Sequence, residues 1–461
     1  MKRFIYPIGS LIILMMIITN SSCEEFVEVD EHFGQILYEE VFENEETATT
    51  AITTLYAKLR DEGILNGGYS SLSIVNSLYT DELEYYGNAG TALYEVYNHF
   101  VLPSNSNLYS FWLRTYHLIY LTNSAIAGLE SSNSLLPETK NQLMGEALFV
   151  RAFLHFYLTN QFGDIPYIKT TNYEINSEVS RMPISEVYNL ILEDLNLSKS
   201  LIGISYSSEL RTRPNKLVVS AFLARVHLYM GNWEQAKTES SILISNSSNI
   251  TIESDIQNEF LKESNSTIWH LSPKSAGENT EDARIFILNS TPSTVSLSSD
   301  FVNSMENNDL RRTHWVGEFN DGTTTWYYPH KYKFNMNTGS SMEYTVIFRL
   351  SEQYLIRAEA LARLGNISDA IEDLNVVRNR AGLPNIEAQS IDELLISISS
   401  ERRFELFTEH GHRWFDIKRF GIQFEVLEPL KPGWRSTNIL FPIPESELLM
   451  NPNLNPQNLG Y

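Results

Sequence analysis

The sequence predicts a mainly α-helical fold in which paired helices form the body and one irregular, loop-rich segment interrupts them. Three observations support this fold class. Apolar residues recur at spacings of three and four through most of the chain after residue 45. Two distant stretches repeat one helix–turn–helix pattern, and residues 246–345 lack helical periodicity and are rich in Ser, Asn and Thr.

The N-terminal helical region, residues 46–245, opens with single apolar stripes. The first stripe is made of Ala48, Ala51, Ile52, Leu55 and Leu59. Residues 111–129 and 140–158 show the same spacing, which predicts two further helices. Gly163-Asp164 and Pro166 then predict a turn that ends a helical hairpin.

The repeated pattern places small residues where two helices approach each other. Ala224 to Ala236 aligns with Ala358 to Ala370, and each stretch contains Gly-Asn between its two predicted helices. Glycine allows the chain to turn and alanine allows close packing, as in a tetratricopeptide helix pair. The two units are far apart in sequence, so they do not form a continuous solenoid, but they could still pack together in space. Coincidence between two unrelated hairpins is the alternative.

Residues 246–345 are expected to form irregular structure with a few short strands. Thr267–Leu271 and Thr325–Tyr328 have strand composition, and Asp321-Gly322 is typical of a tight turn between extended pieces. Loops held on a rigid scaffold commonly carry binding function, so this segment is the expected ligand face.

The C-terminal region, residues 346–461, contains a helix with charges on its apolar side. Ser390 and Glu393 form a capping-box pattern at its start, and an apolar stripe runs through Ile391, Leu394, Leu395 and Ile398. Continued, that stripe reaches charged side chains, which need partners when buried. We expect a buried ion network that locks the helices, made of Glu401, Arg402, Glu405, Arg413, Asp416 and Arg419. A catalytic carboxylate pair is the alternative.

The tail of the chain, residues 431–461, contains five prolines. We expect it to be extended and to lie against the helical body, because its 440–444 segment is too apolar for a free tail.

The N-terminus has the features of an export signal. A basic start precedes an apolar run at 8–18, which is too short to span a membrane comfortably, and Cys23 follows as the only cysteine of the chain. This arrangement resembles the lipobox of bacterial lipoproteins, in which the cysteine is acylated. Glu24-Glu25 resembles the signal that sends such proteins to the outer face of the outer membrane. We therefore expect a signal peptide at 1–22 and a lipid anchor and tether at 23–45; an ordinary signal peptide with an incidental cysteine is the alternative.

Composition and motifs argue against several functional classes. The formal net charge of −23 disfavours binding to nucleic acid or to anionic lipid. The chain lacks G-x-S-x-G, H-E-x-x-H and a phosphate-binding Gly-Lys loop. His410-Gly411-His412 could chelate a metal, but no third ligand is marked. We expect no metal, no cofactor and no catalytic residues.

Four stretches in order resemble the SusD/RagB family of outer-membrane lipoproteins. They span residues 145–166, 349–362, 401–421 and 441–461, and the third is the most specific. The resemblance implies a SusD-like fold with tetratricopeptide-like helix pairs and a looped ligand face. It also implies a non-enzymatic role in nutrient uptake, in which the protein captures an oligosaccharide, or in some members a peptide. The implied partner is a SusC-like TonB-dependent transporter in the same membrane.

Aromatic and carboxamide side chains outside the structural motifs are the candidate ligand contacts. An aromatic ring can stack on a sugar while polar groups bind its hydroxyls. The candidates are Tyr85, Tyr86, Asn88, Trp269, Trp315, Trp326 and Tyr327. Core packing is the alternative for each aromatic residue. A surface glycosidase and a tetratricopeptide adaptor without a small ligand are the competing functional hypotheses.

Overall fold

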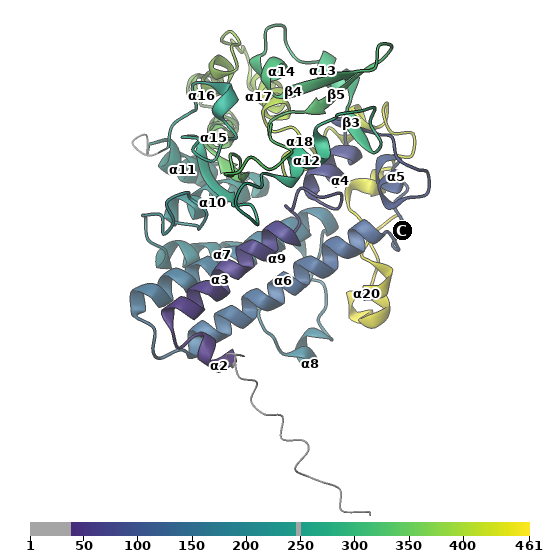
Figure 1. Cartoon of the computed structure of the whole chain (residues 1–461). Helices are drawn as coiled ribbons and strands as arrows, with labels where there is room; N and C mark the ends of the chain where they lie inside the picture. The colour runs from purple at the N-terminus through teal and green to yellow at the C-terminus, as the bar shows by residue number, and fades with distance from the viewer. Residues whose placement is uncertain (1–37, 246–249) are drawn as a thin grey trace, which may run out of the picture.

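Helices account for most of the computed structural model, which describes residues 38–245 and 250–461 (Figure 1). The N-terminal half of the body is built from α2 (Tyr38–Val41), α3 (Glu45–Asp61), α6 (Ser106–Ser131), α7 (Pro137–Phe162) and α9 (Ile184–Leu201). Asn44 caps α3 by accepting from the Glu46 amide at 2.8 Å, and Asn105 caps α6 in the same way. Helix α7 ends at Gly163, which confirms the predicted turn. The mainly α fold is confirmed.

The packed body begins earlier than the sequence predicted. Residues 38–45 were assigned to a tether, yet α2 lies there and the Phe42 side chain is only 4% exposed. Its ring packs directly over Gly128 of α6, where any larger side chain would collide with it. An apolar anchor of this kind fixes the start of the chain onto the helical hairpin.

The two repeated units form helix pairs that pack against each other. They are α10 (Lys216–Met230) with α11 (Trp233–Ile244), and α15 (Leu350–Arg363) with α16 (Ile367–Arg380). Gly231 and Gly365 adopt φ values of 74° and 84° at the two turns, a conformation that disfavours other residues. Ala236 and Ala360 are fully buried in one small cluster between the units, so the predicted packing is confirmed.

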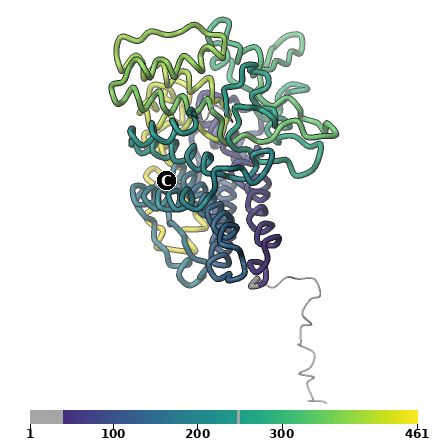
Figure 2. Tube along the Cα trace, turned by 90° about the vertical axis from the view of Figure 1, so that its left-hand side faces the viewer, coloured from purple at the N-terminus to yellow at the C-terminus, as the bar shows by residue number. Residues whose placement is uncertain are grey.

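The segment between these pairs leaves the helical body and returns to it. Strand β2 (Thr267–Leu271) pairs antiparallel with β6 (Thr345–Arg349), so the end of this segment lies beside a strand near its start. A second sheet contains β1 (Leu83–Tyr85), β3 (Val295–Leu297), β4 (Val316–Asn320) and β5 (Thr325–Pro329). This sheet lies at the end of the molecule opposite α2, as both views show (Figures 1 and 2).

The remaining α-helices are short, except for α17. They are α4 (Leu72–Tyr79), α5 (Ala92–Tyr97), α8 (Tyr173–Asn176), α12 (Glu281–Phe286), α13 (Ser299–Asn303), α14 (Leu310–His314), α17 (Ile391–Glu405), α18 (His412–Phe420), α19 (Gln423–Leu427) and α20 (Glu445–Met450). Ser390 caps α17 as predicted, although Ile391 is 38% exposed, so the buried stripe starts at Leu394. The tail contains α20 in addition to the expected extended pieces, and Phe441 and Ile443 are buried against the body.

A buried charge cluster joins α17 to the inserted segment. Glu405 is fully buried and pairs with Arg349 of β6, Arg380 of α16 and Arg311 of α14, the last at 3.2 Å. Burial raises the pKa of Glu405, but the positive charges of the three arginines outweigh it and hold the pKa well below its usual range. Glu409 binds Arg349 and Lys331 beside it. Four segments distant in sequence therefore meet at one set of ion pairs.

The predicted ion network is buried, but its pairing differs from the expectation. Arg402 and Arg419 both bind Asp416, as expected, at 2.7 and 2.9 Å. Arg413 instead binds Asp81, far away in the sequence, at 2.7 Å. Glu401 and Glu405 take their partners from outside the predicted set. The motif thus serves mainly to connect α17 and α18 to other parts of the chain.

Candidate functional site

The sheet β1-β3-β5-β4 brings the N-terminal candidate segment beside the inserted one. Strand β1 pairs antiparallel with β3, so that Leu83 lies opposite Leu297. Leu297 in turn lies opposite Tyr327 of β5, and β5 forms a hairpin with β4. The Asp321-Gly322 turn joins that hairpin, as predicted. Two segments more than 200 residues apart thereby share one surface.

One face of this sheet packs against the core at β1, β3 and the start of β4, and the other carries aromatic rings. Side chains alternate between faces along a strand, and directly paired residues share a face. Leu83, Val295, Leu297 and Val316 are buried on the inner face. The register places Glu84, Ser296, Phe319, Trp326 and Tyr328 on the outer face. We call this outer face, together with Tyr86, the aromatic sheet face.

The rings of the aromatic sheet face are held by close contacts within the sheet. Trp326 lies opposite Phe319, with ring centroids 6.2 Å apart. Tyr328 lies opposite Gly317, and a Cβ at position 317 would come within 2.2 Å of the tyrosine ring. Glycine therefore leaves space for the Tyr328 ring against the strand. All three aromatic side chains are partly exposed.

Tyr86 extends this face beyond the end of β1. Its backbone amide donates to the Thr294 carbonyl at 2.8 Å, and its hydroxyl donates to Glu84 Oε2 at 2.7 Å. Burial of part of the ring, opposed by a hydrogen bond with Ser296 and reinforced by Glu84, raises the pKa of Tyr86 to about 12. The side chain remains 39% exposed, so its ring is accessible to a ligand.

Three more of the predicted site residues are close to the aromatic sheet face, and two of them, Tyr85 and Tyr327, point elsewhere. Tyr85 alternates to the other side, where its hydroxyl bonds to the Asn88 carbonyl at 3.2 Å and to Thr91 Oγ1. The Asn88 side chain is exposed in this loop. Tyr327 packs partly against the core, and the Arg312 guanidinium lies 4.9 Å from its ring centroid.

The other two predicted tryptophans are core residues and are unavailable to a ligand. Trp269 and Trp315 are both 0% exposed. Trp269 lies in β2, where every residue is buried, and its indole N–H donates to the Thr212 carbonyl at 3.1 Å. Trp315 donates to the Ile256 carbonyl at 3.1 Å and packs on Phe260. Both tryptophans belong to the main hydrophobic core, in which Trp269 packs on Phe149 of α7, and we leave both residues out of the site.

Phe319 and Tyr328 belong to the site but were missed as candidates. Both could have been found from the sequence. Counting outward from the Asp321-Gly322 turn pairs Phe319 with Trp326, and strand alternation puts Tyr328 on the same side as Trp326.

Carboxyl groups with strongly perturbed pKa values are found inside the body instead of on the aromatic sheet face. Burial raises the pKa of Glu82, Asp282 and Glu343 to about 7 each. Glu82 accepts from Ser77 and from the Thr408 amide, and Glu343 accepts from two backbone amides, so both have structural roles. These carboxyl groups do not form an accessible acid–base pair.

Residues 38–245 and 250–461 contain neither a metal-ligand cluster nor a membrane-spanning helix. No cluster of three or more potential metal ligands occurs there. His410 and His412 are buried, and His410 bonds to the Val346 carbonyl at 2.7 Å. In that same part of the chain, none of the helices combines the length and apolar character needed to cross a bilayer. The predicted signal peptide and Cys23 lie outside the described residues.

Two family models match most of the chain. Residues 24–228 match a family described as starch-binding and associating with the outer membrane, and residues 245–432 match the SusD family. SusD-like protein P2 of Formosa agariphila is 29% identical over 99% of this chain and 99% of its own length. Starch-binding protein SusD of Bacteroides thetaiotaomicron is 36% identical, over 25% of this chain and 21% of its own.

Solved structures share the fold over nearly the whole chain. A SusD superfamily protein from Bacteroides vulgatus aligns with a TM-score of 0.80 and 21% identity, covering 91% of this chain and 100% of its own. Surface glycan-binding protein A from Bacteroides thetaiotaomicron, solved in complex with laminarihexaose, aligns with a TM-score of 0.75 and 19% identity. That alignment covers 90% of this chain and 99% of the neighbour.

Proposed function

Because the chain belongs to the SusD family, we propose that it is a cell-surface lipoprotein that binds an oligosaccharide on the aromatic sheet face. The bound glycan would pass to a SusC-like TonB-dependent transporter in the outer membrane. In this role the protein captures a nutrient and has no catalytic activity. The observation that carries the proposal is the outward-facing group of Phe319, Trp326, Tyr328 and Tyr86 on one sheet.

The chemistry of this face suits a sugar. Accessible aromatic rings can cover the apolar faces of pyranose rings, while neighbouring polar groups take their hydroxyls. Glu84 supplies a carboxylate acceptor beside Tyr86, and Asn88 supplies an exposed carboxamide nearby. The combination of flat rings and short polar side chains is therefore present on one surface.

The charge of the chain favours a neutral glycan. The formal net charge is −23, and several positive side chains do not reach the surface. Arg225, Arg311, Arg349 and Arg402 are all at most 2% exposed and are paired or hydrogen-bonded inside the body. An acidic surface repels anionic ligands over a Debye length, so neutral sugars are expected to bind better than sulfated or carboxylated ones.

The binding proposal is tested with single substitutions on the sheet. The chain from residue 24 onward keeps every described element and is titrated with oligosaccharides that include laminarihexaose and maltohexaose, and with a peptide library. Trp326→Ala and Tyr86→Ala are expected to weaken glycan binding by about 5- to 150-fold, as loss of a binding hot spot does. Tyr69→Ala is the matched control, because Tyr69 is 44% exposed and lies outside the sheet.

Three results would contradict the proposal. If both sheet variants keep glycan affinity within about twofold, which is no more than a few tenths of a kcal/mol, the ligand binds elsewhere. If only peptides bind and the sheet variants reduce that binding, the protein is a peptide-uptake member of its family. Several rounds of glycan cleavage by the pure protein would show that it is an enzyme.

Anchoring through Cys23 is tested separately. Cys23 follows the apolar run of the predicted signal peptide, and acyl chains on it would hold the mature protein on the membrane. Cys23→Ala is expected to release the protein from the outer-membrane fraction in cells that lack the transporter. Unchanged retention of the variant in such cells would contradict the lipoprotein assignment.

A further inference from the structure

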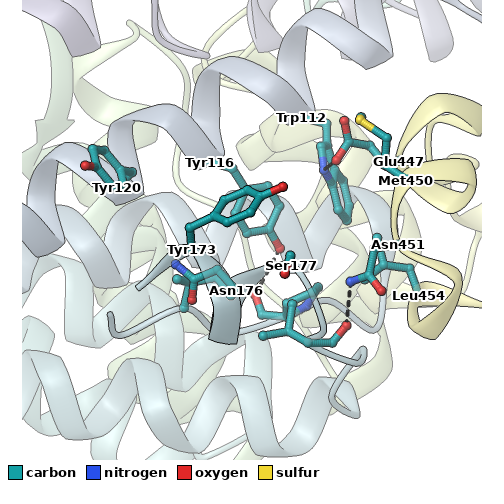
Figure 3. Close-up of a pocket in the computed structure, with 13 residues that line it drawn as sticks. Trp112, Tyr116, Tyr120, Tyr173, Asn176, Ser177, Glu447, Met450, Asn451 and Leu454 are labelled. Atoms are coloured by element: carbon teal, nitrogen blue, oxygen red, sulfur yellow. Dashed lines mark hydrogen bonds between the residues drawn. The ribbon is translucent and has the colours of Figure 1, made fainter. Parts of the chain in front are cut away.

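A separate pocket lies between α6, α8 and the C-terminal tail, away from the aromatic sheet face (Figures 1 and 3). Its volume is about 320 Å³, which lies at the lower end of the range for small-molecule sites. The pocket shares no residue with the aromatic sheet face. Its ligand chemistry can therefore be argued, and tested, independently of the proposed function.

One wall of the pocket is an aromatic stripe on α6. Trp112, Tyr116 and Tyr120 follow each other at intervals of four and so lie on one side of the helix. Trp112 is 2% exposed, and its indole N–H donates to Glu447 Oε2 at 3.3 Å. The Tyr116 hydroxyl donates to the Pro166 carbonyl at 2.9 Å. These two residues are fixed by the fold and shape the base of the pocket.

The mouth of the pocket carries exposed apolar and aromatic side chains. Tyr120 is 47% exposed, Met450 of α20 is 68% exposed and Tyr173 of α8 is 81% exposed. Figure 3 shows Met450 beside Glu447, and Tyr173 between Tyr120 and that end of the lining. The rings of Tyr120 and Tyr173 are thus accessible for stacking on a ligand, because neither is buried in the core.

The electrostatic character of the pocket favours a positively charged ligand. Glu447 is the only charged residue among those that line it, and Lys, Arg and His are absent from its lining. Arg181, which acts electrostatically on Tyr116, directs its guanidinium to Asp164, Pro456 and Asn458 instead. Burial raises the pKa of Glu447, opposed by the Trp112 hydrogen bond, so a nearby cation would favour its ionised form.

A second acceptor in the lining has no partner. Asn176 Oδ1 is buried and makes no hydrogen bond with any other described residue. A buried acceptor without a partner is costly, and a ligand N–H group would satisfy it. The pocket thus combines a carboxylate, a free carbonyl acceptor and accessible aromatic rings.

We propose that this pocket is a second ligand site, which takes an amino sugar that bears a free ammonium group. The ammonium would lie near Glu447 and donate to acceptors of the lining, and the sugar ring would stack on Tyr120 or Tyr173. Cations are also attracted directly to the faces of tyrosine rings.

The test compares two ligands that differ only in the charged group. The chain from residue 24 onward is titrated by calorimetry with the β-linked disaccharide of glucosamine and with its N-acetylated counterpart, at slightly acidic pH where the free amine is protonated. The amino form is expected to bind at least about tenfold more tightly, because a hydrogen bond to a charged group contributes more free energy than one between neutral groups. Equal affinity for the two disaccharides, or no binding of either, would overturn the proposal.

Variants locate the binding and separate it from folding. Glu447→Gln keeps an oxygen acceptor for the Trp112 N–H but removes the charge, and should weaken the amino disaccharide about tenfold. Tyr173→Ala should weaken it about two- to thirtyfold. Leu113→Ala is the matched control, since Leu113 is 47% exposed on α6 outside the pocket. Unchanged affinity in both pocket variants, with unchanged melting temperatures, would overturn the site.

Two further arms of the experiment distinguish related possibilities. Tyr86→Ala, on the aromatic sheet face, is expected to leave binding of the amino disaccharide unchanged. If Tyr86→Ala abolishes it, the sugar binds on the sheet and the pocket proposal fails, while the proposed function stands. A blocked lysine amide serves as a cationic probe without a sugar ring, and tighter binding of this probe than of the amino disaccharide would overturn the assignment to a sugar.

Discussion

Replacing the Glu405 side chain should destabilise the protein strongly with little change in shape. The glutamine variant Glu405→Gln removes the negative charge and keeps the volume. Glu405 is fully buried and pairs with Arg311, Arg349 and Arg380, which are themselves at most 3% exposed. The variant would leave these guanidinium groups without the carboxylate that they share.

The expected cost follows from this geometry. Breaking a buried ion pair by removing one partner typically destabilises a protein by about 3–5 kcal/mol, because an uncompensated charge remains. Here Arg349 keeps Glu409, and Arg311 keeps Asp309 and Glu401, so part of the compensation survives. We therefore expect a loss of about 3 kcal/mol, a large fraction of the 5–15 kcal/mol that stabilises a typical domain.

Tryptophan fluorescence can follow this loss, since one of the chain's seven tryptophans lies beside the cluster. Trp315 lies against the cluster, with the guanidinium of Arg380 5.1 Å and that of Arg349 5.7 Å from its ring centroid. Guanidinium chloride unfolding is followed for the wild type, Glu405→Gln and the control Glu387→Gln, which removes one exposed charge. The control should stay within about 0.5 kcal/mol of the wild type. A loss below about 1 kcal/mol in Glu405→Gln would refute the view that this carboxylate holds the cluster together.

Three further substitutions test other parts of the structure. Glu82 has a folded pKa of about 7, above its unfolded value near 4.5, so its contribution to stability is present at low pH and is lost as pH rises through 7. As pH rises from about 5 to about 8, the wild type should therefore lose unfolding free energy relative to Glu82→Gln, by roughly 3 kcal/mol at most. Urea unfolding of both proteins at the two pH values measures this change. Ala236→Leu should cost about 1–3 kcal/mol by overpacking the interface of the two helix pairs, and an unchanged melting temperature would contradict that packing. Gly317→Ala should displace the Tyr328 ring and weaken glycan binding about as much as Tyr328→Ala does; full affinity would exclude Tyr328 from the site.

Features that depend on local spacing could be predicted from the sequence. The stripes at 47–59, 111–129 and 140–158 correspond to α3, α6 and α7, because a helix that packs on one side must repeat its apolar residues at helical spacing. The Asp321-Gly322 turn was found for a similar reason, since few residues suit a tight hairpin turn. The packing of the two repeated units could be predicted because small residues occupy the same places in both.

The burial of Trp269 and Trp315 could not be predicted from periodicity. An aromatic residue in a segment without helical spacing has no sequence pattern that places it in the core. Strand β2 is buried on both faces, so its residues show no alternation. Trp315 packs on Phe260, which lies 55 positions earlier and belongs to the main hydrophobic core. A short segment between two covered layers gives no local signal of its burial.

The ion-pair partners were missed for a related reason. The sequence showed which charges lie on the buried stripe of α17, but only charges near them in sequence could be offered as partners. Glu405 instead binds Arg349 and Arg311, which lie 56 and 94 positions away. Such pairs are set by the tertiary arrangement, which short-range patterns do not specify.

Residues 401–419 connect the two parts of the chain that form the aromatic sheet face. Just before β1, Asp81 binds Arg413 at 2.7 Å and Arg403 at 2.8 Å, and Glu82 accepts from the Thr408 amide. From the inserted segment, Arg311 binds Glu401 of the same stretch.

Both halves of the sheet are therefore fixed to one short piece of chain, although they join each other through only a few strand pairs. A rigid scaffold of this kind can hold ligand contacts in register while the aromatic side chains themselves vary. Residues 401–421, the stretch that resembles the family most specifically, thus support the candidate site by holding β1 and the inserted strands in place.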